Sequence, residues 1–284
     1  MGQKSQIWLL TNARSGSNNE AALEKLLAHC DECDIAVMRT LRFPDDDLPT
    51  AAELDAEGIK RLGIFTGDGT LNAAITGLYG WGGEIMVLPG GTMNLLSKRL
   101  HGDNEMEDIV RRIDSGAARR VRPTVARCAK GDALAGLLAG PGTAWANVRE
   151  AMRDFDIAEI AQGASEAMSK STDGAMVHLR VPERGRGEGY PLVEMTPSHR
   201  GIQIDGFYAE DAGQFLQQGF ALLRRRFREG PHERLGLLDE IILESEDETS
   251  IGVLIDGEPA EVPCRAKFEV ATCEVDLLAT HHGF

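Results

Sequence analysis

The sequence contains no run of about 18 apolar residues, which excludes a helix that crosses a membrane. We also find no apolar core of a secretion signal, because the first residues lead directly into a strand-like segment, 7–10. Basic charge is scarce: 30 Lys and Arg stand against 45 Asp and Glu, a formal net charge of −15. A nucleic-acid partner and general attraction to an anionic membrane surface are therefore disfavoured, although a local basic patch can still act.

Cysteine is scarce as well, with five residues in 284. An odd number without a secretion signal favours reduced thiols in a cytosol. Cys30 and Cys33 have the spacing of a redox or zinc pair, but Cys30 continues the apolar stripe of a helix. No second pair of ligands lies nearby to complete a tetrahedral site, so we interpret both thiols as structural.

Strand-like and helix-like segments alternate in the first part of the chain, which predicts an α/β layer around a mostly parallel sheet. The strands are expected at 7–11, 35–40, 62–65 and 85–88, and the helices at 20–30, 50–57, 71–78, from 95 and at 106–113.

The pattern changes near residue 118, after which strands dominate. They are expected at 119–128, 133–139, 175–181, 192–195, 202–204, 241–243, 251–255, 268–271 and 275–278. Two helices are expected among them, one marked by Trp145 and Phe155 and one by Leu216 and Phe227. We therefore predict two domains, 1–118 and 119–284, and we allow for the last residues to pack back on the first.

Two glycine-rich turns follow consecutive strands. The turn Gly67-Asp68-Gly69-Thr70 precedes a helix, so backbone N–H groups of the first helical turn are available to a phosphate. Asp68 would repel a phosphate alone, which favours a divalent cation that carries it. The second turn, 89–94, should lie beside the first at the carboxyl edge of the sheet, where such folds bind ligands. A plain structural connection is the alternative for either turn taken alone.

Together these turns resemble the diacylglycerol kinase catalytic family, which includes bacterial lipid kinases, sphingosine kinases and ceramide kinases. The family motifs stand here as Asn12-Ala13-Arg14-Ser15-Gly16, Thr66-Gly67-Asp68-Gly69-Thr70 with Leu71-Asn72, Pro89-Gly90-Gly91-Thr92-Met93-Asn94, and Asp256-Gly257-Glu258. They occur in the family's order and spread over nearly the whole chain.

The resemblance implies an α/β plus β fold: a Rossmann-like, ATP-binding domain and a β-sandwich, lipid-substrate domain, with the active site in the cleft between them. It implies an ATP- and Mg²⁺-dependent lipid kinase of phospholipid metabolism that phosphorylates an alcohol group. Diacylglycerol, ceramide and sphingoid bases all stay open as acceptors. We expect a cytoplasmic protein, peripheral at the inner face of a membrane. Its oligomeric state is open, a homodimer included, and Arg224–Arg226 are either a contact to lipid head groups or a solvated helix face.

The resemblance also assigns roles to residues of this sequence. It places nine of them at the nucleotide: Asn12, Thr40, Thr66, Gly67, Asp68, Gly69, Thr70, Asn72 and Thr92. Asp68 would hold Mg²⁺ through water, and Glu258 would accept the proton of the lipid hydroxyl, with Asp256 beside it in the catalytic group. Asp205 resembles a metal ligand of the second domain in some members, and an ordinary Asp-Gly hairpin turn is its alternative.

One departure from the family pattern is Thr66, which replaces a glycine. If this position needs a positive φ, threonine would cost about 1–3 kcal/mol of strain, whereas at an ordinary strand end it is harmless. Two other functions stay open. One is a non-catalytic lipid- or nucleotide-binding regulatory relative, and the other is NAD kinase, which shares the Gly-Asp-Gly-Thr element.

Overall fold

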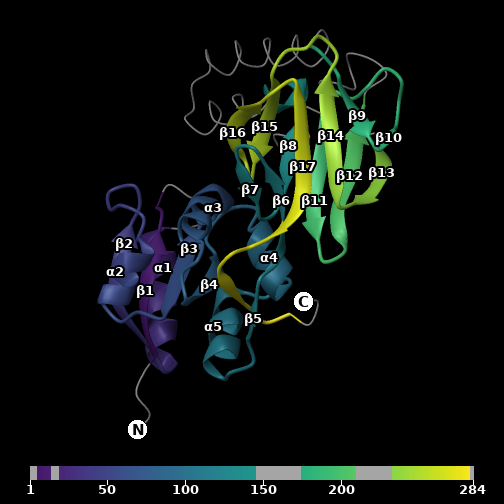
Figure 1. The fold of residues 1–284 in the computed structure, drawn as a ribbon. Helices are drawn as coiled ribbons and strands as arrows, with labels where there is room; N and C mark the ends of the chain where they lie inside the picture. The colour runs from purple at the N-terminus through teal and green to yellow at the C-terminus, as the bar shows by residue number, and fades with distance from the viewer. Residues whose placement is uncertain (1–4, 14–18, 145–173, 209–231, 282–284) are drawn as a thin grey trace. The chain divides into compact units, whose positions relative to one another are not determined.

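The computed structural model describes residues 5–13, 19–144, 174–208 and 232–281 (Figure 1). The chain forms two compact units, one of residues 1–123 with 272–284 and the other of residues 124–271. The expected roles of two domains, ATP binding for 1–118 and lipid binding for 119–284, stay predictions.

The first unit contains a six-stranded sheet in the order β2-β1-β3-β4-β18-β5. The pairs β1–β2, β1–β3, β3–β4 and β4–β18 are parallel, and β5 joins β18 antiparallel. The strands are β1 (Ser5–Thr11), β2 (Ile35–Arg42), β3 (Arg61–Thr66), β4 (Glu84–Pro89), β5 (Arg119–Val121) and β18 (Asp276–Ala279). Strand order reverses between β1 and β3, so this sheet has its switch point there.

Helices accompany this sheet: α1 (Glu20–Glu32), α2 (Ala51–Ala56), α3 (Asp68–Gly77), α4 (Leu95–His101) and α5 (Met106–Asp114). Asn19 caps α1 by accepting from Ala22 N, and Thr50 forms a capping box with Glu53 at α2. One core cluster joins α1 and α5 to alternate residues of the strands. It contains Leu26 from α1, Ile109 from α5 and Phe65 from β3. The intervening strand residues, such as Ile64 at 0% exposure, are also buried, as expected for a parallel sheet covered on both faces.

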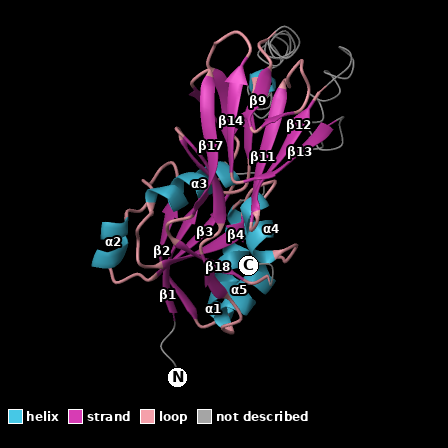
Figure 2. Ribbon diagram, turned by 45° about the vertical axis from the view of Figure 1, so that its right-hand side comes forward, coloured by secondary structure: helices cyan, strands magenta, loops and turns pink. Residues whose placement is uncertain are grey.

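The second unit consists of strands almost throughout its described part (Figure 2). Its sheets have the orders β10-β9-β14-β17-β6-β7 and β13-β12-β11-β8-β15-β16. The strands are β6 (Thr124–Cys128), β7 (Gly131–Ala133), β8 (Leu137–Ala139), β9 (Val177–Val181), β10 (Glu183–Arg184), β11 (Leu192–Ser198), β12 (Gly201–Phe207), β13 (His232–Leu238), β14 (Glu240–Ser245), β15 (Ile251–Ile255), β16 (Glu258–Val262) and β17 (Arg265–Thr272), and a 3-10 turn covers Pro141–Ala144.

One hydrophobic core fills the space between these two sheets. Leu243 and Phe268 enter it from the first sheet, and Val193, Ile204 and Val253 enter it from the second. The pairs β8–β11, β11–β12 and β12–β13 are antiparallel, as are β9–β14 and β14–β17. The predicted combination of a parallel α/β layer with antiparallel sheets is therefore confirmed.

Several expected elements differ from the structure. The strand expected at 119–128 is two strands of different sheets, β5 and β6, because Pro123 interrupts it and has no N–H to donate. The strand expected at 133–139 is likewise split into β7 and β8. Strands β13 and β16 were not expected, since both are edge strands rich in charged side chains.

The two helices expected around Trp145 and Leu216, and Arg224–Arg226, lie outside the described residues. Within the described part of the chain, every helix is too short or too polar to span a membrane.

Candidate functional site

The two glycine turns lie against each other at the carboxyl edge of the first sheet, as the sequence predicted. Strands β3 and β4 are parallel neighbours, with Thr66 opposite Pro89. A Cβ atom on Gly90 would lie 2.6 Å from Thr66 N, and one on Gly91 would lie 2.6 Å from Gly67 Cα. Since real Cβ contacts are not that short, the turns contact through bare backbone, and only glycine fits at positions 90 and 91.

Thr66 is the last residue of β3 and is 2% exposed. Among the described non-glycine residues, positive φ occurs at Asn94, Glu248 and Asp256, so Thr66 has ordinary strand geometry. The strain that a left-handed threonine would bring is therefore absent at this position, and the harmless alternative is correct. Its hydroxyl donates to Gly67 O at 3.2 Å.

The N-terminus of α3 follows directly. Its N-cap is Gly67, with φ −79° and ψ 166°, and no side chain caps the helix there. The first-turn N–H groups of an α-helix lack intrahelical partners, so this end can receive an anion. Asn12, which follows β1 and is 8% exposed, donates from Nδ2 to Thr70 Oγ1 at 2.9 Å. This bond ties the loop after β1 to α3 across the switch point.

Asn94 shapes the second glycine turn. It is the N-cap residue of α4, and its φ is 52°. Its Oδ1 accepts from Gly91 N at 2.7 Å, and its Nδ2 donates to Gly91 O at 2.9 Å. The predicted site did not include it, although the Gly-Thr-x-Asn spacing was a signal, because asparagine is among the few residues that tolerate a left-handed backbone.

Asp68 links the beginnings of the two helices, since it is the first residue of α3 and its Oδ1 accepts from Leu96 N in α4 at 3.4 Å. In the described part of the chain, no three or more His, Cys, Asp and Glu side chains come together as a metal-binding group. A single carboxylate beside a helix N-terminus that can receive a phosphate nevertheless suits Mg²⁺, which keeps several waters and takes ligands from substrate phosphates. Asp68 thus fits the ion that the resemblance implies.

The other predicted nucleotide residues are placed as follows. Gly69 and Thr70 lie in the first turn of α3, Asn72 lies in its next residues, and Thr92 is exposed in the second glycine turn. Thr40 lies in β2 opposite Leu9, on the far side of β1 from the glycine turns. The structure therefore gathers these residues at the carboxyl edge of one sheet, with Thr40 two strands away from β3.

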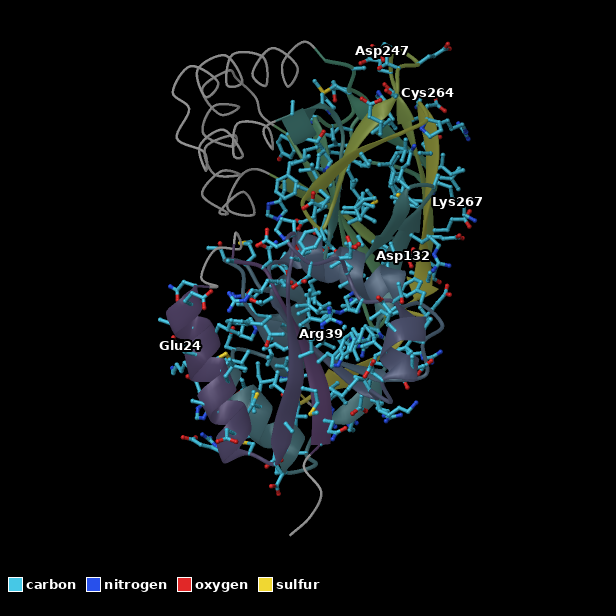
Figure 3. All side chains as sticks on the ribbon, turned by 90° about the vertical axis from the view of Figure 1, so that its left-hand side faces the viewer. Glu24, Arg39, Asp132, Asp247, Cys264 and Lys267 are labelled. Carbon is cyan, nitrogen blue, oxygen red and sulfur yellow. The ribbon has the colours of Figure 1, made fainter. Side chains whose placement is uncertain are left out.

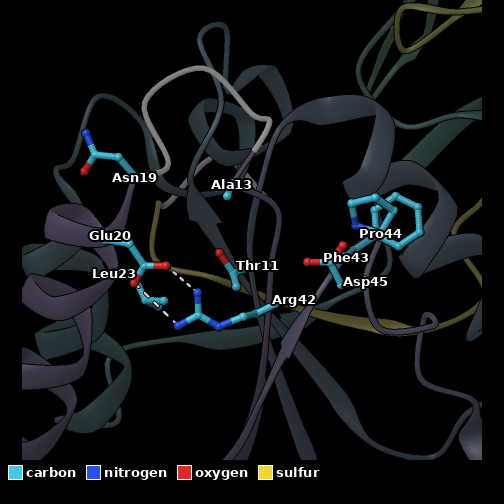
Figure 4. A pocket seen from close by; sticks show the side chains of 9 residues that line it. All are labelled: Thr11, Ala13, Asn19, Glu20, Leu23, Arg42, Phe43, Pro44 and Asp45. Atoms are coloured by element: carbon cyan, nitrogen blue, oxygen red, sulfur yellow. Dashed lines mark hydrogen bonds and ion pairs between the residues drawn. The ribbon is translucent and has the colours of Figure 1, made fainter.

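A pocket of about 160 Å³ lies at the carboxyl ends of β1 and β2 (Figure 4). Its lining residues are Thr11, Ala13, Asn19, Glu20, Leu23, Arg42, Phe43, Pro44 and Asp45. The Arg42 guanidinium makes two contacts with the Glu20 carboxylate, one of them between Nη2 and Oε2 at 3.5 Å. This pair lowers the pKa of Glu20 and raises that of Arg42. The pocket was not predicted, because its lining residues come from three separate segments of the sequence.

In the second unit, Asp256 and Gly257 form the two-residue hairpin turn between β15 and β16. Their φ angles are 48° and 95°, the pattern of a type I′ turn. The Asp256 carboxylate accepts three backbone N–H groups, from Leu134 at 2.8 Å, Ala135 at 2.9 Å and Gly136 at 2.8 Å. The catalytic role expected for Asp256 stays a prediction. In the structure its carboxylate binds the backbone of residues 134–136.

Glu258 is the first residue of β16 and pairs with Ile255. It is exposed, and its carboxylate has no hydrogen-bond or ion-pair partner among the described residues. A carboxylate without such partners is available to accept a proton from a substrate.

Asp205 is not in a hairpin turn, so that alternative is wrong. It lies inside β12, opposite Glu194 of β11 and Arg234 of β13, and is 4% exposed. Its Oδ1 accepts from Arg234 Nε at 3.2 Å and its Oδ2 from Gln203 Nε2 at 2.6 Å. Its charge is thus balanced by an arginine, and the metal role expected for it stays a prediction.

Comparisons with known proteins agree with these observations. Residues 6–126 match the sequence model of the diacylglycerol kinase catalytic domain. No curated protein matches the sequence.

Three solved structures from Bacillus anthracis str. Sterne have a similar fold, at identities that support the fold alone. A diacylglycerol kinase is 14% identical, with a TM-score of 0.62 over 100% of both chains. A putative diacylglycerol kinase is 16% identical, with a TM-score of 0.60 over 100% of this chain and 98% of that one. A further putative diacylglycerol kinase is 17% identical, with a TM-score of 0.57 over 98% of both chains.

The matched segment ends within β6, so it covers both glycine turns and the strands of the first sheet except β18. The fold is therefore that of a two-domain, diacylglycerol kinase-like protein. The resemblance of this chain to the diacylglycerol kinase catalytic family, expected from its motifs, is confirmed.

Proposed function

We propose that this protein is a lipid kinase that transfers the γ-phosphate of ATP to the hydroxyl of a membrane lipid alcohol. The observation that carries the proposal is the backbone contact between the two glycine turns beside the uncapped N-terminus of α3. The match of 6–126 to the family's catalytic domain supports it. Phosphoryl transfer depends mainly on positioned backbone donors and charge neutralisation, and this edge of the sheet offers both.

In this proposal the first unit is a Rossmann-like nucleotide domain. The ATP phosphates lie against Gly67, Gly69 and Thr70, and Thr92 and Asn72 complete the polar lining. Asn12 acts through its bond to Thr70, which fixes the start of α3. Thr66 supports the turn, and Thr40 serves the nucleoside end of ATP. Asp68 holds Mg²⁺, which neutralises phosphate charge when bound.

Glu258 acts on the lipid that accepts the phosphate. The lipid hydroxyl oxygen forms a bond to the γ-phosphorus while the bond from that phosphorus to the β,γ-bridging oxygen breaks. ADP leaves, and the hydroxyl proton passes to the Glu258 carboxylate. That the reaction takes place in a cleft between the two units, at a membrane surface, stays a prediction.

The non-catalytic alternative was based on Thr66 in place of the family's glycine. Thr66 has no positive φ, so backbone strain at this position does not favour that alternative. NAD kinase is kept as a control in the test.

The proposal is tested by transfer of radiolabelled γ-phosphate from ATP, with Mg²⁺, to alcohols in detergent micelles. The panel contains diacylglycerol, monoacylglycerol, ceramide, sphingosine and, as a water-soluble control, NAD. We expect one of the lipids to become labelled. Labelled NAD, or ATP binding without any labelled lipid, would overturn the proposal.

The variant Asp68→Asn tests the metal role in the same assay. It should raise the Mg²⁺ concentration needed for the half-maximal rate, since it removes the carboxylate charge. Its matched control is Glu24→Gln, which removes one carboxylate from the exposed side of α1 (Figure 3) and should leave the Mg²⁺ dependence unchanged. Equal Mg²⁺ dependence in the two variants would show that Asp68 is not near the metal.

A further inference from the structure

Glu258 lies in an edge strand, where its own side chain does little to hold it in place. It begins β16, which is last in its sheet and pairs with β15. The side chain is exposed, and within the described residues its carboxylate makes no hydrogen bond or ion pair. Its location therefore depends on the backbone of β15 and on the turn of Asp256 and Gly257.

Asp256 attaches that turn to another part of the unit. Its carboxylate accepts from the N–H groups of Leu134, Ala135 and Gly136 at 2.8–2.9 Å, and its own N–H donates to Gly136 O at 3.0 Å. A carboxylate has about four acceptor sites, so these three bonds use most of its capacity. Charge-assisted bonds of this kind are roughly twice as strong as neutral ones.

The segment that Asp256 holds is itself well fixed. Leu134 and Ala135 are 1% and 8% exposed. They connect β7 in one sheet to β8 in the other. Strand β8 also pairs with β15, with Leu137 opposite Ile255. The turn is thus anchored on the unit's core through both its backbone and its one charged side chain.

We propose that Asp256 is a positioning residue that holds the turn in front of Glu258, and that it does not itself take the proton. This inference rests on the proposed kinase function, in which Glu258 is the proton acceptor. It assigns Asp256 and Glu258 separate tasks, although they stand two residues apart.

A second turn of the same unit supplies a matched control. Asp247 follows β14, and its Oδ1 accepts from Ser245 Oγ at 3.0 Å, Thr249 N at 3.0 Å and Thr249 Oγ1 at 2.6 Å. All three donors lie within two residues of Asp247, whose position is labelled in Figure 3. Asp247→Asn therefore removes the charge of a carboxylate that binds within its own turn. It leaves the bonds between Asp256 and residues 134–136 in place.

The test compares Asp256→Asn, Asp247→Asn and Glu258→Gln with the wild type. Asparagine tolerates the left-handed φ of position 256, so Asp256→Asn removes the charge and one of the two acceptor oxygens with little change of backbone preference. We expect kcat to fall about 10- to 100-fold in Asp256→Asn, the scale of a slightly misplaced catalytic group, while the KM for ATP is unchanged. Asp247→Asn should keep the wild-type kcat.

The pH profile of kcat separates positioning from proton acceptance. A proton acceptor must be unprotonated to act, so the wild-type kcat should fall towards acid pH, and Glu258→Gln should lose this limb. Asp256→Asn should keep the limb at a lower overall rate. If Asp256→Asn loses the limb instead, or if its kcat equals that of Asp247→Asn, the proposal is overturned.

Amide hydrogen exchange tests the holding role without any turnover. Asp256→Asn should speed exchange at 134–136 about tenfold or more, and Asp247→Asn should not. Unchanged exchange at 134–136 overturns the inference. A wild type without kinase activity, but with the expected exchange pattern, overturns the proposed function and supports the role of Asp256 in the turn.

Discussion

The contact between the two glycine turns makes Gly91→Ala the most direct test of the candidate site. The new Cβ would lie 2.6 Å from Gly67 Cα and 3.3 Å from Asn94 Oδ1. Gly91 does not have a positive φ, so alanine brings no backbone strain of its own. The whole effect comes from contact, and the turns must separate by about 0.8 Å to reach an ordinary distance of 3.4 Å.

This separation has two measurable consequences. Overpacking in a tight backbone contact costs about 1–3 kcal/mol, so the urea midpoint of unfolding should fall. The start of α3 also moves relative to the second turn, so ATP affinity, measured by calorimetric titration, should drop about tenfold or more, as expected when positioned donors shift.

Gly82→Ala is the control, because a Cβ there has nothing within 4 Å and Gly82 does not have a positive φ. It should change neither the midpoint nor ATP affinity. If Gly91→Ala behaves like Gly82→Ala in both measurements, the turns are not in the contact described, and the nucleotide site built on that contact is refuted.

Other predictions concern single side chains. Burial lowers the pKa of His101 from 6.5 to about 4, so the free energy of unfolding should fall by about 2 kcal/mol between about pH 7 and pH 5, where only the unfolded state gains the proton. The urea midpoint at both pH values checks this, and a fall as large in His101→Gln would contradict it. Thr66→Gly should lower the melting temperature without raising kinase turnover, because Thr66 has strand geometry; a gain in turnover would disprove that reading. Asn12→Ala should raise the KM for ATP and leave kcat unchanged, since it releases Thr70; an unchanged KM would count against Asn12.

The α/β part of the fold was predictable because its signals are local. Buried strands such as Ile85–Leu88 read as short apolar runs, and Ile109 and Ile113 mark a helix face within one segment. The glycine turns were placed together for a similar reason, as consecutive parallel strands end at the same edge of a sheet.

Features that depend on distant residues were not predictable. Asp256 accepts from residues about 120 positions away, and Asn12 donates to Thr70 across 58 positions. Nothing near either residue indicates its partner. Strand β16 was missed because an edge strand is half solvated and its sequence, Glu-Pro-Ala-Glu-Val, lacks the apolar alternation of an inner strand.

The return of the chain to its first unit has a consequence for biosynthesis. Strand β18 lies between β4 and β5, yet it is made after all the other strands that the structure describes. Until Asp276–Ala279 leaves the ribosome, β4 has an open edge and the sheet under the second glycine turn is incomplete. A nascent chain that ends between residue 94 and this strand therefore contains both glycine turns but lacks the finished sheet that carries them. The sheet of the first unit is therefore complete only after the whole second unit has been synthesised.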